Sequence, residues 1–133
     1  MTIKTFATSR CHFVLQEFFD SDLAVKENID LSIDASLNKK YNVVENLTLL
    51  VQEILEPARR LLGEPIVITS GYRNNRINHL VGGSRNSYHL QGRAADVTCV
   101  HLDKLYTILS QSKATEVIFH PDRNYIHVAY EWK

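Results

Sequence analysis

The sequence predicts an α+β fold in which helices pack on one face of a mostly antiparallel sheet. The predicted elements run in the order helices, strand, long loop, strand, helix and hairpin, a succession typical of this class. The chain has 133 residues, 44% of them apolar, which is enough for one packed core. No internal repeat and no linker-like stretch divides it. We therefore expect residues 1–133 to form a single domain.

The first forty residues are expected to wrap around this core. Apolar residues 13–19 predict a short helix, and residues 20–22 offer a cap for a second short turn. Residues 28–40 are largely polar, with four Ile and Leu residues between the polar positions. We interpret residues 28–40 as a loop that its apolar side chains attach to the core.

The clearest helix spans residues 43–62. Its apolar side chains recur at spacings of three and four, which places them on one buried stripe. Asn42 is positioned to cap the helix at its start, and Gly63 to end it. Pro57 lies inside the pattern, and we expect it to kink the helix because the stripe continues beyond it.

The middle of the chain predicts two strands, a loop and a second helix. β-Branched and small side chains indicate strands at residues 65–69 and 94–100. The polar stretch between them, residues 74–86, is expected to be a loop. Leu and Tyr side chains on one face predict a helix over residues 102–109.

A hairpin is expected at the end of the chain. Two apolar runs, residues 116–119 and 125–130, flank a turn at residues 121–124 that contains Pro, Asp and Asn. Strand alternation places the side chain of His127 on the same face as those of Tyr125 and Ala129. This histidine is therefore available to a neighbouring strand.

His89, Asp96 and His127 are candidate metal ligands. His89 and Asp96 lie seven residues apart with a glycine between them, so a turn can bring the histidine beside the strand that carries the carboxylate. Neighbouring strands could bring Asp96 and His127 together. Two imidazoles and one carboxylate form a three-ligand zinc site whose fourth position is left for water or substrate. On spacing alone, each histidine could equally be a hydrogen-bonded structural residue.

Several short motifs carry a family resemblance. They are Ser70-Gly71-Tyr72-Arg73, Asn78, Val81-Gly82-Gly83, the pattern S-x-H-x-x-G-x-A-x-D at residues 87–96, Ile126-His127-Val128, the opening helix at residues 13–22 and Leu55-Glu56-Pro57-Ala58-Arg59. Together they resemble the zinc D-Ala-D-Ala carboxypeptidase family of murein peptidases, and most closely its small branch found in phages, prophages and gut bacteria. The likeness covers roughly residues 13–130.

The resemblance implies a fold, a cofactor and an activity. The fold would be the α+β arrangement of these D,D-peptidases, which they share with the signalling domain of hedgehog proteins. His89, Asp96 and His127 would bind zinc. The activity would be cleavage of peptide bonds in peptidoglycan stem peptides, as a D-Ala-D-Ala carboxypeptidase or a murein endopeptidase.

Two further residues match positions that the family uses near its substrate. Arg73 matches an arginine whose planar guanidinium could hold a peptide carboxylate with two hydrogen bonds. Ser87 matches a hydroxyl that could contact the substrate or brace the loop before His89. The alternative for Arg73 is a surface arginine that closes a turn.

The general base of the family is the point at which this sequence departs from the pattern. Better-studied members have an acidic residue three positions before the last histidine, where this chain has Asn124. In the small branch the acid often ends the preceding strand, and His120 stands there. We expect His120 to be the catalytic base, with Asp122 and Glu116 as the other candidates. The alternative is a catalytically inactive cell-wall-binding or phage structural module that keeps the fold and the zinc site.

Composition excludes other classes of partner. Fifteen basic and fifteen acidic residues give a formal net charge of zero, which disfavours binding to nucleic acid. No apolar run reaches the roughly 20 residues that span a bilayer, so no membrane partner is expected. Residues 1–6 lack the apolar core of a secretory leader. We expect synthesis in the cytoplasm and action on the cell wall after release or delivery.

Overall fold

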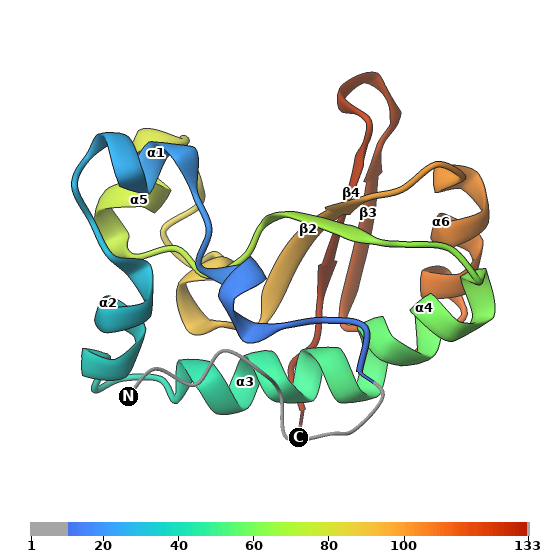
Figure 1. The fold of residues 1–133 in the computed structure, drawn as a ribbon, viewed down its shortest axis with the longest axis horizontal. Helices are drawn as coiled ribbons and strands as arrows, with labels where there is room; N and C mark the ends of the chain where they lie inside the picture. Colours follow the sequence, from blue (N-terminus) through green and yellow to red (C-terminus); the bar gives the residue numbers. More distant parts are fainter. Residues whose placement is uncertain (1–10, 133) are drawn as a thin grey trace.

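Four strands form one antiparallel sheet in the computed structural model, which describes residues 11–132. The order across the sheet is β1-β2-β4-β3, and Figure 1 shows the β3–β4 hairpin projecting from the rest of the chain. The bounds are β1 (Val67–Ser70), β2 (Ala94–Thr98), β3 (Glu116–His120) and β4 (Tyr125–Ala129). The predicted hairpin is therefore confirmed. Residues 1–6, on which the expectation about a secretory leader rests, lie outside the described residues.

The long predicted helix is present, with a change of pitch in the middle. It consists of α3 (Val43–Leu50), the π-helical turn η2 (Val51–Leu55) and α4 (Glu56–Leu62). The Asn42 side chain accepts a hydrogen bond from the amide of Glu45, and Gly63 ends the helix with a φ of 74°. Because Pro57 has no N–H to donate, the hydrogen-bond ladder rearranges just before it, as expected for a proline inside a helix.

The helices cover one face of the sheet, as predicted. Ala95 and Val97 of β2 and Ile126 and Val128 of β4 belong to the hydrophobic core, together with side chains of α3, η2 and α6 (Leu102–Ser110). Strand alternation turns Asp96 and His127 to the opposite face of the sheet. The α+β class is thus confirmed, and the two strand-borne candidate ligands lie on the face away from this helical layer.

Short helices gather at the end of the molecule away from α4 and α6 (Figure 1). They are α1 (Asp22–Lys26), α2 (Leu31–Leu37) and α5 (Asn75–Leu80), and three 3-10 turns accompany the main elements: η1 (Leu15–Phe18), η3 (Tyr88–Gln91) and η4 (Pro121–Arg123). None of the helices within residues 11–132 has the length and apolar character needed to cross a membrane.

The interpretation of residues 28–40 and 74–86 as loops is wrong where α2 and α5 form. Each of these helices begins at a side chain that caps it. Asp30 accepts hydrogen bonds from the amides of Ser32 and Ile33, and Asn74 accepts one from the amide of Ile77. Short capped helices of this kind leave only one or two buried side chains, so their apolar periodicity is weak in the sequence.

Candidate metal centre

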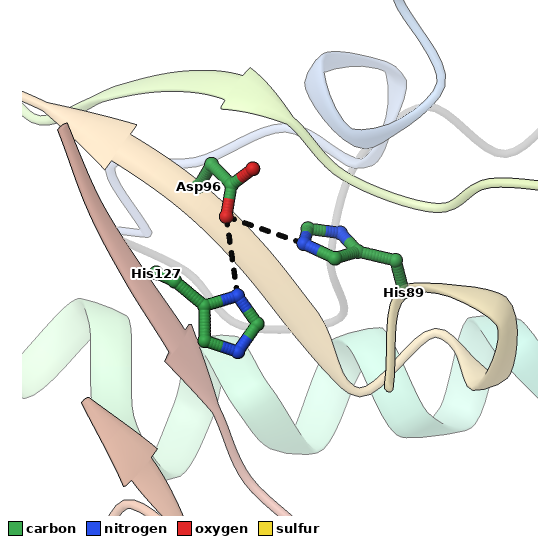
Figure 2. A group of neighbouring side chains, drawn as sticks. All are labelled: His89, Asp96 and His127. Atoms are coloured by element: carbon green, nitrogen blue, oxygen red, sulfur yellow. Dashed lines mark hydrogen bonds and ion pairs between the residues drawn. The ribbon is translucent and has the colours of Figure 1, made fainter. Parts of the chain in front are cut away.

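The three predicted ligands meet at one carboxylate oxygen. Oδ1 of Asp96 lies 3.2 Å from Nε2 of His89 and 3.2 Å from Nδ1 of His127 (Figure 2). One donor atom from each residue lies within 4.8 Å of the other two. His89 and Asp96 are buried and His127 is partly buried. Side chains separated by up to 38 positions in the sequence therefore form one compact donor cluster.

The sheet register positions two of these side chains. Asp96 of β2 and His127 of β4 are direct partners across an antiparallel ladder. Directly opposed residues of such a pair have their Cβ atoms about 5 Å apart, so the two side chains meet on the open face. The sequence prediction that neighbouring strands bring them together is confirmed.

The turn η3 brings His89 to the same point. The Ser87 hydroxyl oxygen accepts a hydrogen bond from the amide of His89 at 3.1 Å, which caps the turn. Gly92 then adopts a φ of 72°, a left-handed conformation that glycine takes without steric cost, and returns the chain to β2. The expected turn between His89 and Asp96 is therefore the one that the structure shows.

A backbone carbonyl fixes the orientation of the His89 ring. Nδ1 of His89 lies 2.8 Å from the carbonyl oxygen of Gly71, which can only accept a hydrogen bond. A side chain at Gly71 would not fit, because its Cβ would lie 2.5 Å from the Cα and the carbonyl oxygen of Phe18. The close approach of these two backbone segments thus explains the glycine in the Ser70–Arg73 motif.

The donor set fits a zinc ion. Each of the two rings faces oxygen on both sides: His89 faces Gly71 and Asp96, and His127 faces Asp96 and Glu116. A neutral imidazole has only one N–H, so its second nitrogen presents a lone pair to an oxygen. A second ring proton or a metal cation between these atoms removes the conflict, and two imidazoles with one carboxylate are ligands that zinc prefers. The partners of the outer ring nitrogens, a carbonyl and a carboxylate, are those usual for metal-bound histidines.

The electrostatics keep this cluster charged. Burial raises the pKa of Asp96, but hydrogen bonds from His127 and His89 outweigh it and hold this pKa well below its usual value. Burial lowers the pKa of His127, and its hydrogen bonds with Asp96 and Glu116 outweigh that effect and raise it. Asp96 is therefore an ionised ligand at neutral pH.

Arg73 contacts the carboxylate of the donor cluster. Its Nη2 is 3.3 Å from Oδ2 of Asp96, and its Nη1 and Nε reach Asn78 Oδ1 and Ser70 Oγ at the same distance. The side chain is 14% exposed and lines a neighbouring cavity. Arg73 is more than a surface residue that closes a turn, because it is tied to the carboxylate that would hold the metal.

The strand β3 carries two residues that flank His127. Ile118 pairs directly with His127, and Glu116 and His120 lie two residues to either side of it on the same face. Oε1 of Glu116 is 2.8 Å from Nε2 of His127. His120 instead stacks on Tyr125, with ring centroids 4.5 Å apart.

From the sequence, Glu116 is only an alternative to His120 as the general base, and its contact with His127 is not predicted. The available signal for this contact is strand alternation, because it places Glu116 and His120 on the same face of β3. The two remaining positions do not contact the ligands in the part of the chain that the structure describes. Asn124 takes a left-handed conformation and accepts a hydrogen bond from Thr98, and Asp122 lies in the exposed turn η4.

A comparison with protein-family models gives a match. A family model described as Peptidase M15 matches residues 11–129, which is most of the chain and includes every candidate ligand. The match confirms the resemblance that the motifs indicated. A search of curated proteins found no relative of this chain.

Proposed function

Because the chain belongs to the Peptidase M15 family, we propose that it is a zinc-dependent peptidase that cleaves peptide bonds in peptidoglycan stem peptides. The reaction would be that of a D-Ala-D-Ala carboxypeptidase or a murein endopeptidase, on the cell wall after release or delivery. The observation that carries the proposal is the meeting of His89 Nε2, Asp96 Oδ1 and His127 Nδ1 within 4.8 Å. Peptidase activity follows from the family, and the substrate is our inference.

The proposed ligands are His89, Asp96 and His127. A zinc ion held there would act as a Lewis acid on a peptide carbonyl and lower the pKa of bound water. The protein contributes the orientation of the ligands: the Gly71 carbonyl fixes one ring, Glu116 fixes the other, and Arg73 holds the free oxygen of the carboxylate. These contacts preorganise the site before any substrate arrives.

We assign the proton transfer to His120. Its ring lies on the open face, two residues along β3 from the partner of His127, and it makes no hydrogen bond to another side chain among residues 11–132. An imidazole nitrogen that lacks a proton can take one from the attacking water and return it to the leaving amine. Glu116 is less suited to this task, because its carboxylate already accepts the hydrogen bond of His127.

Arg73 and Ser87 would contact the substrate. Both line a cavity next to the donor cluster, and Arg73 has the planar donors that match a carboxylate or a polarised carbonyl. Ser87 Oγ accepts one hydrogen bond from the amide of His89, and its own proton is free to be donated to the substrate.

The test is hydrolysis of purified peptidoglycan and of synthetic stem peptides by the zinc-loaded protein. We expect mass spectrometry to show released D-Ala for a carboxypeptidase, or separated stem peptides for an endopeptidase. The control is His89→Ala, which should give no product and should retain the circular dichroism spectrum of the wild type. Zinc binding and peptidoglycan binding with no product would overturn the proposal in favour of an inactive wall-binding module.

A further inference from the structure

A second feature of the surface lies beside the donor cluster. A cavity of about 290 Å³ opens between the end of α2, the segment after β1 and the loop that precedes η3. Arg73 and Ser87 form the wall that it shares with the metal site, since one contacts Asp96 and the other caps the turn of His89. A peptide whose scissile bond lies at the donor cluster would place a neighbouring group in this cavity.

The cavity is positive in a protein with no net charge. Its lining includes Lys40, Arg73 and Arg85 but only one carboxylate, Asp34. That carboxylate is already engaged, because Oδ2 of Asp34 accepts a hydrogen bond from the Asn74 amide at 2.5 Å. Since the whole chain has a formal net charge of zero, this local excess of cations is a property of the cavity.

The cations of the cavity differ in how many protein groups they already contact. Arg73 directs three of its five N–H donors at Asp96, Asn78 and Ser70. Across residues 11–132, the side chains of Lys40 and Arg85 make no ion pair, and Lys40 only lies 5.5 Å from the centre of the Tyr41 ring. The cavity thus has two exposed cations whose hydrogen-bonding groups are free for a ligand.

We propose that this cavity binds a carboxylate of the peptide substrate, with Arg85 and Lys40 as its charge partners. The inference rests on the proposed peptidase function and names the substrate it would favour: a peptide with a free carboxylate close to the scissile bond. Both cations donate charge-assisted hydrogen bonds, and Arg85 can do so with two parallel donors. The carboxylate can come from the chain terminus or from a side chain.

The test measures peptide binding to the zinc-free protein, so that binding is read without turnover. The probes are acetyl-Lys-D-Ala-D-Ala with a free terminus, the same peptide as its C-terminal amide, and the amide extended by an N-terminal γ-linked D-Glu that carries its own carboxylate. Dissociation constants come from NMR titrations. The variants are Arg85→Gln and Lys40→Gln, and the matched control is Lys104→Gln, an exposed lysine of α6 outside the cavity.

We expect at least one carboxylate peptide to bind the wild type about tenfold more tightly than the amide that carries no carboxylate, as charge-assisted hydrogen bonds allow. Arg85→Gln should remove most of this difference and Lys40→Gln part of it, while Lys104→Gln changes nothing. The peptide that loses affinity identifies the source of the carboxylate. The preference should also weaken as salt is raised, because both cations are exposed.

Equal binding of all three peptides, or no detectable binding of any of them, would overturn the inference. So would an unchanged preference in Arg85→Gln and Lys40→Gln. These results are separate from the fate of the proposed function. A protein that hydrolyses stem peptides without a carboxylate preference refutes only the cavity assignment, and one that prefers carboxylates without hydrolysing them refutes only the peptidase.

Discussion

His127 uses both of its ring nitrogens, and this decides the role of its neighbours. Nδ1 faces Asp96 at 3.2 Å and Nε2 faces Glu116 at 2.8 Å. Both partners are carboxylates, which only accept, so a zinc ion bound at Nδ1 would leave the ring proton on Nε2, directed at Glu116. Glu116 therefore acts as a positioning residue for His127, in the way that carboxylates orient metal-bound histidines.

Replacement of Glu116 should weaken zinc binding. We expect Glu116→Ala to lower zinc affinity about 10- to 100-fold, the usual effect of losing such an outer partner. Glu116→Gln keeps an acceptor oxygen and should lose less. Competition with a chromophoric chelator measures the affinity without any substrate. The matched control is Glu64→Ala, which removes a similar carboxylate from His101 outside the site. An affinity of Glu116→Ala equal to that of the wild type would refute the positioning role.

Replacement of His120 should slow hydrolysis and leave zinc binding unchanged. We expect His120→Ala to lower kcat for peptide hydrolysis by about 10²- to 10⁴-fold, the range for loss of a general base. Zinc stoichiometry should stay at the wild-type value, because His120 contacts Tyr125 and not the ligands. Asp122→Asn, in the adjacent turn, is the control. If His120→Ala is fully active and Asp122→Asn is not, the base is Asp122.

At the scale of elements, a buried carboxylate ties the N-terminal segment to the long helix. Glu56, the first residue of α4, is 6% exposed. Its oxygens accept hydrogen bonds from the His12 amide at 2.6 Å and from Arg60 Nε at 3.0 Å, and Nδ1 of His12 lies 2.6 Å from Oε2. A buried carboxylate with this many partners is stabilising only while it is ionised.

The contacts of Glu56 with His12 and Arg60, which we call the clamp, make the stability of the fold depend on pH. Burial raises the pKa of Glu56, but the hydrogen bonds from His12 and Arg60 outweigh it and lower this pKa below the ordinary value. Its contribution is therefore present above the unfolded pKa of about 4 and is lost as pH falls through the lower folded pKa. We expect Glu56→Gln to reduce the free energy of unfolding at pH 7 by about 1–3 kcal/mol.

Urea unfolding at several pH values checks this expectation. The difference between the wild type and Glu56→Gln should shrink as pH falls below about 4, where the wild-type carboxylate begins to protonate. Glu53→Gln is the matched control, because Glu53 lies one turn earlier and pairs with Lys113 at an exposed site. A difference that stays constant from pH 7 to pH 3 would show that the ionised form of Glu56 is not what stabilises the clamp.

Elements differed in how far the sequence could predict them. The long helix and the final hairpin have strong periodicity, because each buries many side chains at regular spacing, as Leu47, Leu50 and Ile54 do. The helix α2 buries only Leu31 and Ala35, and its start depends on the Asp30 side chain. A signal of two buried residues and one cap cannot be separated from a loop by periodicity, so α2 and α5 were missed.

At the scale of the molecule, the convergence of the three candidate ligands could be predicted and the contacts around them could not. Strand alternation and the spacing of His89, Asp96 and His127 can be read from the sequence, and the family motifs point to the same three residues. The contact of Glu116 with His127 depends on the register of β3 against β4. The link from Arg73 to Asp96 depends on the packing of the segment after β1 beside β2. Neither this strand register nor this packing can be predicted from short stretches of sequence.

Because the proposed ligands come from η3, β2 and β4, zinc should stabilise the whole fold. The three donors converge only in the folded chain, so zinc binds the native state and shifts the unfolding equilibrium by mass action. At a free zinc concentration 100 times Kd the gain is about 2.7 kcal/mol, which for a chain of this size raises Tm by about 10 °C. Differential scanning calorimetry, with and without zinc, measures the shift. His89→Ala and Asp96→Asn should show little or none when each is compared with its own zinc-free form, since the first lacks an imidazole and the second lacks the anionic carboxylate. An equal shift in His89→Ala would mean that zinc binds elsewhere on the molecule, and the metal centre would have to be reassigned.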